Sequence, residues 1–202
     1  MRSSSKFIWA IGLGSVLLSG AAMAKPFSYN YVEGGIADVE DDDNNDADYM
    51  FAGGSLALDP QQQILLRASA SNLDYDNNVE LDAISIGVGH PISLSERSDV
   101  LMALDYSMAE TDSPNPVLDG IDVDTLTASA TSRTWLTNNI EGNLMVGLAH
   151  QETDRDDDTG AEIGAGVRLY IIPQFSVAAN ISRSFVGDLD RDLLGLSARL
   201  QF

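Results

Sequence analysis

Residues 193–202 read LLGLSARLQF, and this last stretch of the chain decides the fold class. From Leu194 to Phe202 every second side chain is apolar, and the residues between them are glycine, serine, arginine and glutamine. Successive side chains of a β-strand point to opposite faces of the sheet, so one face is hydrocarbon and the other is small or polar. This pattern is typical of a transmembrane β-barrel wall, whose outer face contacts lipid.

Nine more segments repeat the alternation, separated by turn-forming residues. The ten predicted strands are residues 27–37, 48–58, 63–73, 81–92, 99–109, 123–136, 140–151, 160–171, 174–185 and 193–202. We predict an all-β fold, a closed antiparallel transmembrane β-barrel of ten strands, with eight strands as the alternative. A soluble β-sandwich would also alternate, but large apolar side chains would fill its core, whereas the second face here carries serine, glycine, arginine and glutamate.

The connections between the predicted strands fall into two kinds. Four are short and nearly neutral, at residues 59–62, 93–98, 137–139 and 172–173. The other five, with the adjoining strand ends, hold 24 of the 31 acidic residues, within 38–48, 74–82, 110–124, 152–158 and 188–192. Outer-membrane barrels have short periplasmic turns and longer external loops. We therefore predict acidic external loops, with the carboxyl terminus on the periplasmic side.

The first 24 residues have the features of a secretory signal peptide. Arg2 and Lys6 precede an apolar run at residues 7–18, and Ala22-Met23-Ala24 is a small-x-small cleavage pattern. The apolar run is shorter than the ~20 residues that a membrane-spanning helix needs. We predict a signal peptide at residues 1–24 and one barrel domain at residues 25–202, located in the bacterial outer membrane.

Composition narrows the choice of partners. The chain has no cysteine, so a closed hydrogen-bonded barrel, and not disulfide bonds, would stabilise it. Its formal net charge of −20 argues against nucleic acid, because phosphates require lysine and arginine. We expect a monomer without a cofactor, surrounded by outer-membrane lipid and lipopolysaccharide, with Ca²⁺ or Mg²⁺ as counterions of the acidic loops.

Two resemblances to known families support this interpretation. The alternation and the terminal Phe202 resemble small outer-membrane barrels of the OmpA and OmpX kind, in which the assembly machinery reads the aromatic end of the closing strand. Residues 28–35 (SYNYVEGG) and 54–58 (GSLAL) resemble the opening of a small outer-membrane protein family typical of xanthomonads and other gammaproteobacteria. These resemblances imply location and fold, and they carry no catalytic residues.

The histidines do not complete a catalytic pattern. Barrel proteases of the omptin family use an Asp-x-His unit at the external rim, whereas His150 is preceded two positions earlier by Leu148. The other histidine, His90, lies beside a predicted periplasmic turn. Barrel acyltransferases and deacylases need a rim histidine with serine and an acid, and Glu152 and Thr153 near His150 match this only partly. We therefore expect no enzymatic activity.

Asp154, Asp156 and Asp158 are weak candidates for a metal site, because alternate carboxylates can converge on a hard cation. An EF-hand loop requires glycine at its sixth position and glutamate at its twelfth. Counted from Asp154, Gly160 is seventh and Ala165 is twelfth. A solvated acidic loop is therefore the preferred interpretation.

The same alternation directs charged side chains into the barrel. Glu33 could take either face, but a carboxylate in contact with lipid is costly, so we orient it inward. The first and last strands adjoin where the barrel closes, which makes Glu33 and Arg199 predicted partners. The predicted lumen charge cluster consists of Glu33, Arg67, Asp105, Arg133, Glu162, Arg168 and Arg199.

This cluster has two functional interpretations. Ion pairs that fill the lumen predict a non-enzymatic barrel for envelope structure or surface interaction, since small barrels have interiors just wide enough for side chains. A continuous water path past the arginines would instead predict a small passive channel.

Overall fold

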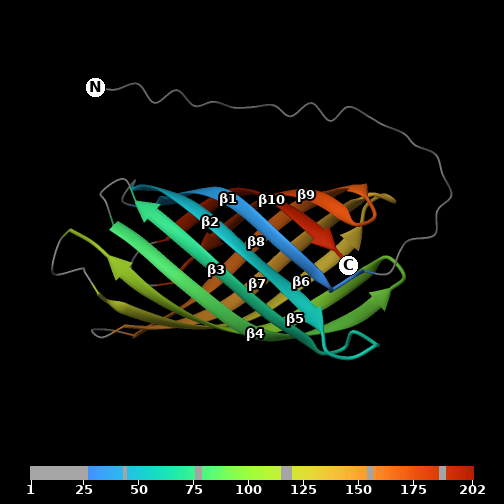
Figure 1. Ribbon diagram of the computed structural model, residues 1–202, viewed down its shortest axis with the longest axis horizontal. Helices are drawn as coiled ribbons and strands as arrows, with labels where there is room; N and C mark the ends of the chain where they lie inside the picture. The colour runs from blue at the N-terminus through green and yellow to red at the C-terminus, as the bar shows by residue number, and fades with distance from the viewer. Residues whose placement is uncertain (1–26, 43–44, 76–78, 115–119, 154–156, 187–189) are drawn as a thin grey trace, which may run out of the picture.

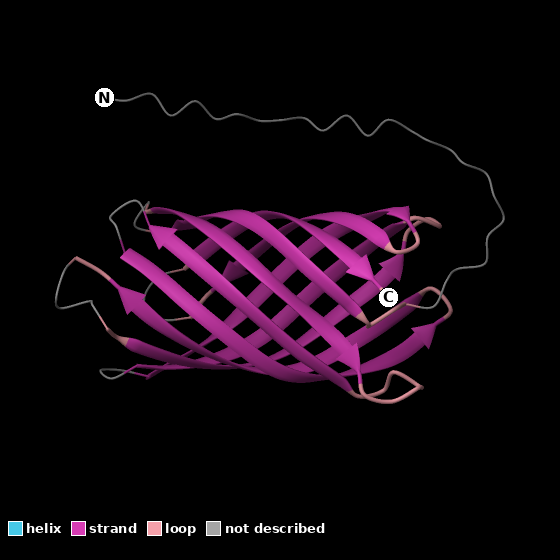
Figure 2. Cartoon of the chain, in the orientation of Figure 1, coloured by secondary structure: helices cyan, strands magenta, loops and turns pink. Residues whose placement is uncertain are grey.

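In the computed structural model, ten antiparallel strands close into one barrel (Figures 1 and 2). The structure describes residues 27–42, 45–75, 79–114, 120–153, 157–186 and 190–202. The strands are β1 (Tyr31–Asp41), β2 (Asp46–Ala57), β3 (Leu65–Tyr75), β4 (Val79–Ser95), β5 (Ser98–Asp112), β6 (Asp122–Trp135), β7 (Ile140–Thr153), β8 (Asp157–Ile172), β9 (Phe175–Ser184) and β10 (Arg191–Gln201). Each strand pairs with its chain neighbours, and β1 pairs with β10 to close the barrel.

The prediction of ten strands, rather than eight, is confirmed. Most differences lie at strand ends. The first strand begins at Tyr31, four residues after its predicted start, and β5 and β8 extend to Asp112 and Asp157. Aspartates there suggested loops, but their side chains are exposed, so the backbone ladder continues beneath them. The predicted signal peptide lies outside the described residues. In the described part of the chain, no helix is long and apolar enough to span a membrane.

Side chains alternate between the two faces of the wall as the sequence predicts. In β10, Leu194, Leu196 and Leu200 are exposed at 60%, 59% and 50%, while Gly195 and Ser197 are buried. The other strands repeat this arrangement, with leucine, isoleucine, valine and methionine outside. A soluble monomer rarely exposes a continuous apolar surface of this extent. The outer wall is therefore suited to hydrocarbon, and most polar burial lies inside the barrel.

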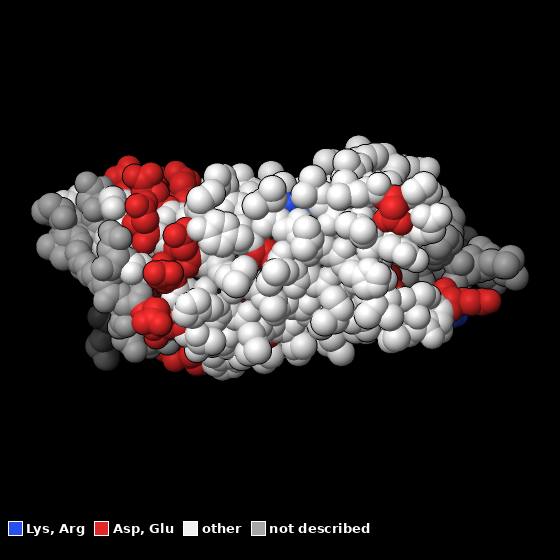
Figure 3. Space-filling model, turned by 90° about the horizontal axis from the view of Figure 1, so that it is seen from below, with Lys and Arg blue, Asp and Glu red and all other residues white. Residues whose placement is uncertain are grey.

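The two ends of the barrel differ in charge. We call the end with the short connections 58–64, 96–97, 136–139 and 173–174 the turn end; the carboxyl terminus lies there (Figure 1). At the opposite loop end, exposed acids of the strands form an acidic girdle (Figure 3). Its members are Asp38, Glu40, Asp46, Asp48, Asp74, Glu80, Asp82, Glu110, Asp112, Asp122, Glu152, Asp157 and Asp192. Several face each other directly across strands, as Glu40 faces Asp46.

Candidate functional site

A buried ion pair lies in the lumen near the turn end. Arg133 of β6 donates from Nε to Glu141 Oε1 at 2.9 Å and from Nη2 to Glu141 Oε2 at 3.1 Å. The Tyr170 hydroxyl of β8 donates to the same Glu141 Oε2 at 2.8 Å. Both charged side chains are almost completely buried, at 6% and 2% exposure. A buried charge requires such two-pronged pairing and added hydrogen bonds, so these three residues form one unit that joins three strands.

Aromatic rings surround this ion pair. Trp135 stacks on Phe27 with ring centroids 5.4 Å apart, and Trp135 and Tyr170 lie 4.9 Å apart. The guanidinium of Arg133 lies 4.4 Å from the centroid of the Phe27 ring. Tyr29 donates its hydroxyl hydrogen to Asp99. Burial raises the pKa of Tyr29 well above its usual range, so the hydroxyl keeps this proton. The turn-end mouth of the lumen is thus filled by side chains.

A second cluster spans the seam where β1 meets β10. The structure brings Glu33 and Arg199 together, with Arg199 Nε 2.7 Å from Glu33 Oε2, and the two residues are directly opposed in the strand register. Arg168 of β8 also reaches Glu33, with Nη2 2.6 Å from Oε1. Ser197 donates to the same oxygen at 2.6 Å. The Glu33 carboxylate therefore forms ion pairs with two arginines. The sequence predicted only the pair with Arg199.

A third ion pair joins β3 and β5 over the inner face of β4. Arg67 Nη1 of β3 lies 2.9 Å from Asp105 Oδ2 of β5. Asp105 reaches across β4 at Gly87, where a Cβ atom would come within 2.1 Å of Asp105 Oδ1. Glycine at this position is therefore required by the approach of the carboxylate. Glu162 lies on the lumen wall beside Gly147 and joins none of these pairs.

A cavity of about 370 Å³ lies among these clusters. Its lining includes Tyr29, Glu33, Arg67, Ser85, Asp105, Arg133, Glu141, Arg168 and Arg199. Most of the charged groups around it face a partner of opposite sign. Apolar residues such as Phe51 and Leu101 complete the lining, and the charged groups are neutralised by other groups of the same chain.

Sequence reasoning missed four residues of the turn-end cluster, namely Asp99, Trp135, Glu141 and Tyr170. The parity signal for Glu141 was present, because Leu144 and Val146 of the same strand face outward and place odd-numbered residues inside. The same reasoning, from Met102 and Leu104, places Asp99 inside. Both acids lie beside turns, and a charged residue beside a turn is ordinarily expected to be exposed to solvent.

The histidine candidate lies away from the lumen. His150 is exposed on the outer wall in line with Leu148, and its Nδ1 lies 2.8 Å from the Thr159 hydroxyl. Asp154 and Asp156 fall outside the described residues, and Asp158 belongs to β8. Among the described residues, no three histidine or acidic side chains are grouped so that they could hold a metal ion.

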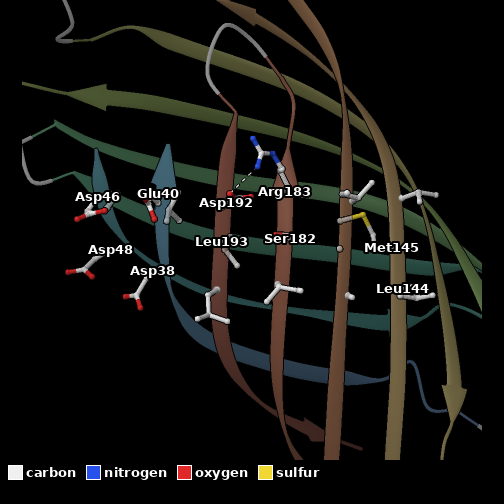
Figure 4. Close-up of a pocket in the computed structure, with 18 residues that line it drawn as sticks. Asp38, Glu40, Asp46, Asp48, Leu144, Met145, Ser182, Arg183, Asp192 and Leu193 are labelled. Carbon is white, nitrogen blue, oxygen red and sulfur yellow. Dashed lines mark hydrogen bonds and ion pairs between the residues drawn. The ribbon is translucent and has the colours of Figure 1, made fainter. Parts of the chain in front are cut away.

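A larger pocket lies where the acidic girdle meets the apolar wall. It has a volume of about 980 Å³ and is bordered by the loop-end parts of β1, β2, β9 and β10 and by the middle of β7 and β8 (Figure 4). Four acids of β1 and β2 line one side: Asp38, Glu40, Asp46 and Asp48. Arg183 and Asp192 form an ion pair of 3.2 Å at its upper edge. Leu144 and other outer-wall residues provide its apolar border.

Comparison with known proteins identifies the fold. No family model matches the chain, and no curated protein matches it. The β domain of the Bordetella autotransporter BrkA is 9% identical, with 88% of this chain and 100% of that chain covered and a TM-score of 0.56. A bacterial polysaccharide outer-membrane secretin is 11% identical over 87% of this chain and 66% of that chain, with a TM-score of 0.52. The translocator domain of the autotransporter NalP from Neisseria meningitidis is 10% identical over 89% and 91%, with a TM-score of 0.51.

These similarities define a class. The chain has the fold of the outer-membrane β-barrels, as its alternation and its terminal phenylalanine predicted. At such identities the likeness concerns the fold alone.

Proposed function

We propose that this protein is a non-enzymatic barrel of the bacterial outer membrane, with a lumen filled by its own ion pairs, that serves envelope structure or interactions at the cell surface. One observation carries the proposal: the same strands expose apolar side chains outward and bury paired charges inward. A wall of this kind is stable only when hydrocarbon covers it.

The rest of the chain supports this location. The signal peptide at residues 1–24 would direct export with cleavage after Ala24, and the terminal Phe202 is the residue that the assembly machinery would recognise. The turn end would then face the periplasm, and the acidic girdle would lie at the level of the outer leaflet, among lipopolysaccharide head groups. Divalent cations would screen the carboxylates there.

The filled turn-end mouth supports a structural role over a channel. Arg133, Glu141, Trp135 and Tyr170 occupy the lumen from β6, β7 and β8, and their groups contact one another. A conducting pore would need a continuous water path past these side chains. The cavity of about 370 Å³ is the observation that favours the second candidate, a passive channel.

The geometry of His150 does not support a rim enzyme. A catalytic histidine needs an acid or a nucleophile within about 2.6–3.2 Å, placed where substrate can bind. The Thr159 hydroxyl lies 2.8 Å from His150 Nδ1, but both side chains are exposed on the outer wall, where His150 is in line with Leu148 and hydrocarbon would surround them.

Planar-bilayer recording of the purified, detergent-folded barrel tests the proposal. We expect no conductance steps of uniform size. Uniform steps that persist after further purification would replace the structural role with the channel. Fractionation of cells expressing the full chain tests the location independently, and recovery of the protein in the inner membrane or the soluble fraction would contradict it.

A further inference from the structure

The residues before β1 form a strap across the turn-end mouth. We call Phe27–Tyr29 the N-terminal strap; Asn30 anchors it, because Asn30 Oδ1 accepts a hydrogen bond from the Ala57 backbone N–H at 2.7 Å and the Asn30 carbonyl accepts one from Phe202 at 3.1 Å. Beyond Asn30, the strap is held by side chains. The Tyr29 N–H donates to the Gln62 side chain at 3.1 Å.

Both rings of the strap point into the lumen. Tyr29 is only 4% exposed, and its hydroxyl reaches Asp99. Phe27 lies flat against Trp135, at an interplanar angle of 12°. Arg133 faces both rings, with its guanidinium carbon 4.4 Å from the Phe27 centroid and 5.1 Å from that of Tyr29. The strap therefore fills the space above the Arg133–Glu141 pair.

The strap is attached differently from the rest of the wall. Each strand is fixed by backbone ladders on both sides, so no strand can leave without opening the barrel. The strap lies outside these ladders and depends on two rings and a few side-chain hydrogen bonds. The strap can therefore change its conformation while the ten-stranded barrel stays closed.

The strap also borders the central cavity, because Tyr29 and Arg133 belong to its lining. We propose that the N-terminal strap is a latch that seals the cavity from the turn end. With Phe27 and Tyr29 in place, solutes do not enter from this side. When the rings swing out, water and small ions reach the arginines of the cavity. This inference rests on the barrel proposed above, but its test in detergent does not depend on the protein's location or role.

The absence of cysteine in the chain allows a direct test by thiol labelling. Ser85 lines the cavity, so Ser85→Cys places a reporter inside. A charged methanethiosulfonate reagent is applied to the folded barrel with an intact strap and to the Phe27→Ala/Tyr29→Ala variant. Ser28→Ala is the matched control on the strap, since it leaves both rings in place. Gln174→Cys, in an exposed turn, gives the rate of an open site.

We expect the double variant to label the Ser85→Cys reporter at least on the order of tenfold faster than the barrel with an intact strap. Ser28→Ala should label at the parent rate. The latch is refuted if the parent labels as fast as Gln174→Cys, or if removing both rings leaves the rate unchanged. Heat-dependent gel mobility verifies folding. If the double variant does not fold, the labelling rate of Ser85→Cys is compared between the parent and Phe27→Ala. This single variant keeps the Tyr29–Asp99 hydrogen bond.

The two proposals fail in different ways. Conductance of the parent barrel would overturn the structural role, whereas an unchanged labelling rate would overturn the latch alone. Conductance that appears only in the Phe27→Ala/Tyr29→Ala variant would support both the closed lumen and the latch.

Discussion

Glu33 is the residue on which the barrel seam depends. It accepts from Arg168, Arg199 and Ser197, and these donors come from two different strands. The sequence places Glu33 opposite Arg199 through strand parity and closure, and that contact is present. Arg168 could not be assigned as a partner in this way, because its distance from the seam depends on barrel curvature and not on alternation.

This sharing of one carboxylate sets the order of mutational effects. Glu33→Gln leaves two buried guanidinium groups without their anion, so we expect it to lower the free energy of unfolding by about 3–5 kcal/mol. Arg199→Leu leaves the Glu33–Arg168 pair intact and should cost less. Adding Glu33→Gln to Arg199→Leu should lower stability further, since Arg168 then loses its partner.

Thermal unfolding of the four proteins in detergent, followed by circular dichroism, measures this order. For an isolated Glu33–Arg199 pair the double variant would instead regain part of the loss. Such a recovery would mean that Arg168 does not share Glu33 in the folded barrel.

Gly87 is a second residue with a defined steric role. An alanine methyl group would meet Asp105 Oδ1 at 2.1 Å and the Leu104 carbonyl at 2.7 Å. We expect Gly87→Ala to lower stability by about 1–3 kcal/mol, because the Arg67–Asp105 pair must shift. Gly34→Ala is the matched control, since its nearest contact would be an ordinary 3.4 Å. Equal unfolding temperatures for the two variants would contradict this role.

At the scale of elements, alternation predicted the existence of every strand but not all strand ends. A strand requires only that side chains alternate between two environments, which residues such as Ile84, Ile86 and Val88 show clearly. An end depends on where the ladder stops, and exposed acids such as Asp112 carry no signal for this. The strap at Phe27–Tyr29 continues the alternation of β1 without pairing, so sequence could not separate it from the strand.

The turn between β2 and β3 is organised by one aspartate. Asp59 Oδ1 accepts from the Ile64 N–H at 2.7 Å, and Oδ2 accepts from the Gln61 N–H at 3.1 Å. The hydrogen bond from Ile64, with others from the turn, lowers the pKa of Asp59. A lowered carboxyl pKa stabilises the turn at pH values above the unfolded pKa, and this contribution is lost as pH falls through the lowered value.

We therefore expect amide hydrogen exchange at Ile64 to accelerate, relative to its intrinsic rate, as pH is lowered through the acidic range. In Asp59→Asn this extra pH dependence should disappear, because the amide oxygen does not titrate. Hydrogen exchange read by NMR of the detergent-folded barrel measures both. The same pH dependence in Asp59→Asn would assign the effect to another group.

At the scale of the whole molecule, the barrel has an apolar wall, a charged interior and two unlike ends. The sequence predicted this arrangement because all three features follow from periodicity and from the placement of acids. The contacts within the turn-end cluster did not follow, since rings from the strap and from β6 and β8 meet only after the barrel has closed.

The polarity of the ends predicts the orientation in cells. A cysteine at Asp157, at the loop end, should react with a membrane-impermeant maleimide on intact cells. Cysteines at Gln62 and Asn138, in turn-end connections, should react only after the outer membrane is opened. Labelling of Asn138→Cys in intact cells would mean that the barrel has the opposite orientation in the membrane. Asp43 and Asn115, two further predicted external positions, lie outside the described residues.

The acidic girdle also bears on how the barrel enters a bilayer. If the loop end leads, its carboxylates must pass through hydrocarbon, where a central charge costs about 2.5–3.5 kcal/mol on insertion scales. Anionic head groups would repel the same carboxylates before they reach the hydrocarbon, and salt would shorten the range of that repulsion. Unassisted refolding should accordingly be slower into anionic than into zwitterionic vesicles, with the difference shrinking as ionic strength rises. The girdle would thus slow insertion of the barrel into the bilayer. After the loop end has crossed, the girdle would also slow its return through the hydrocarbon.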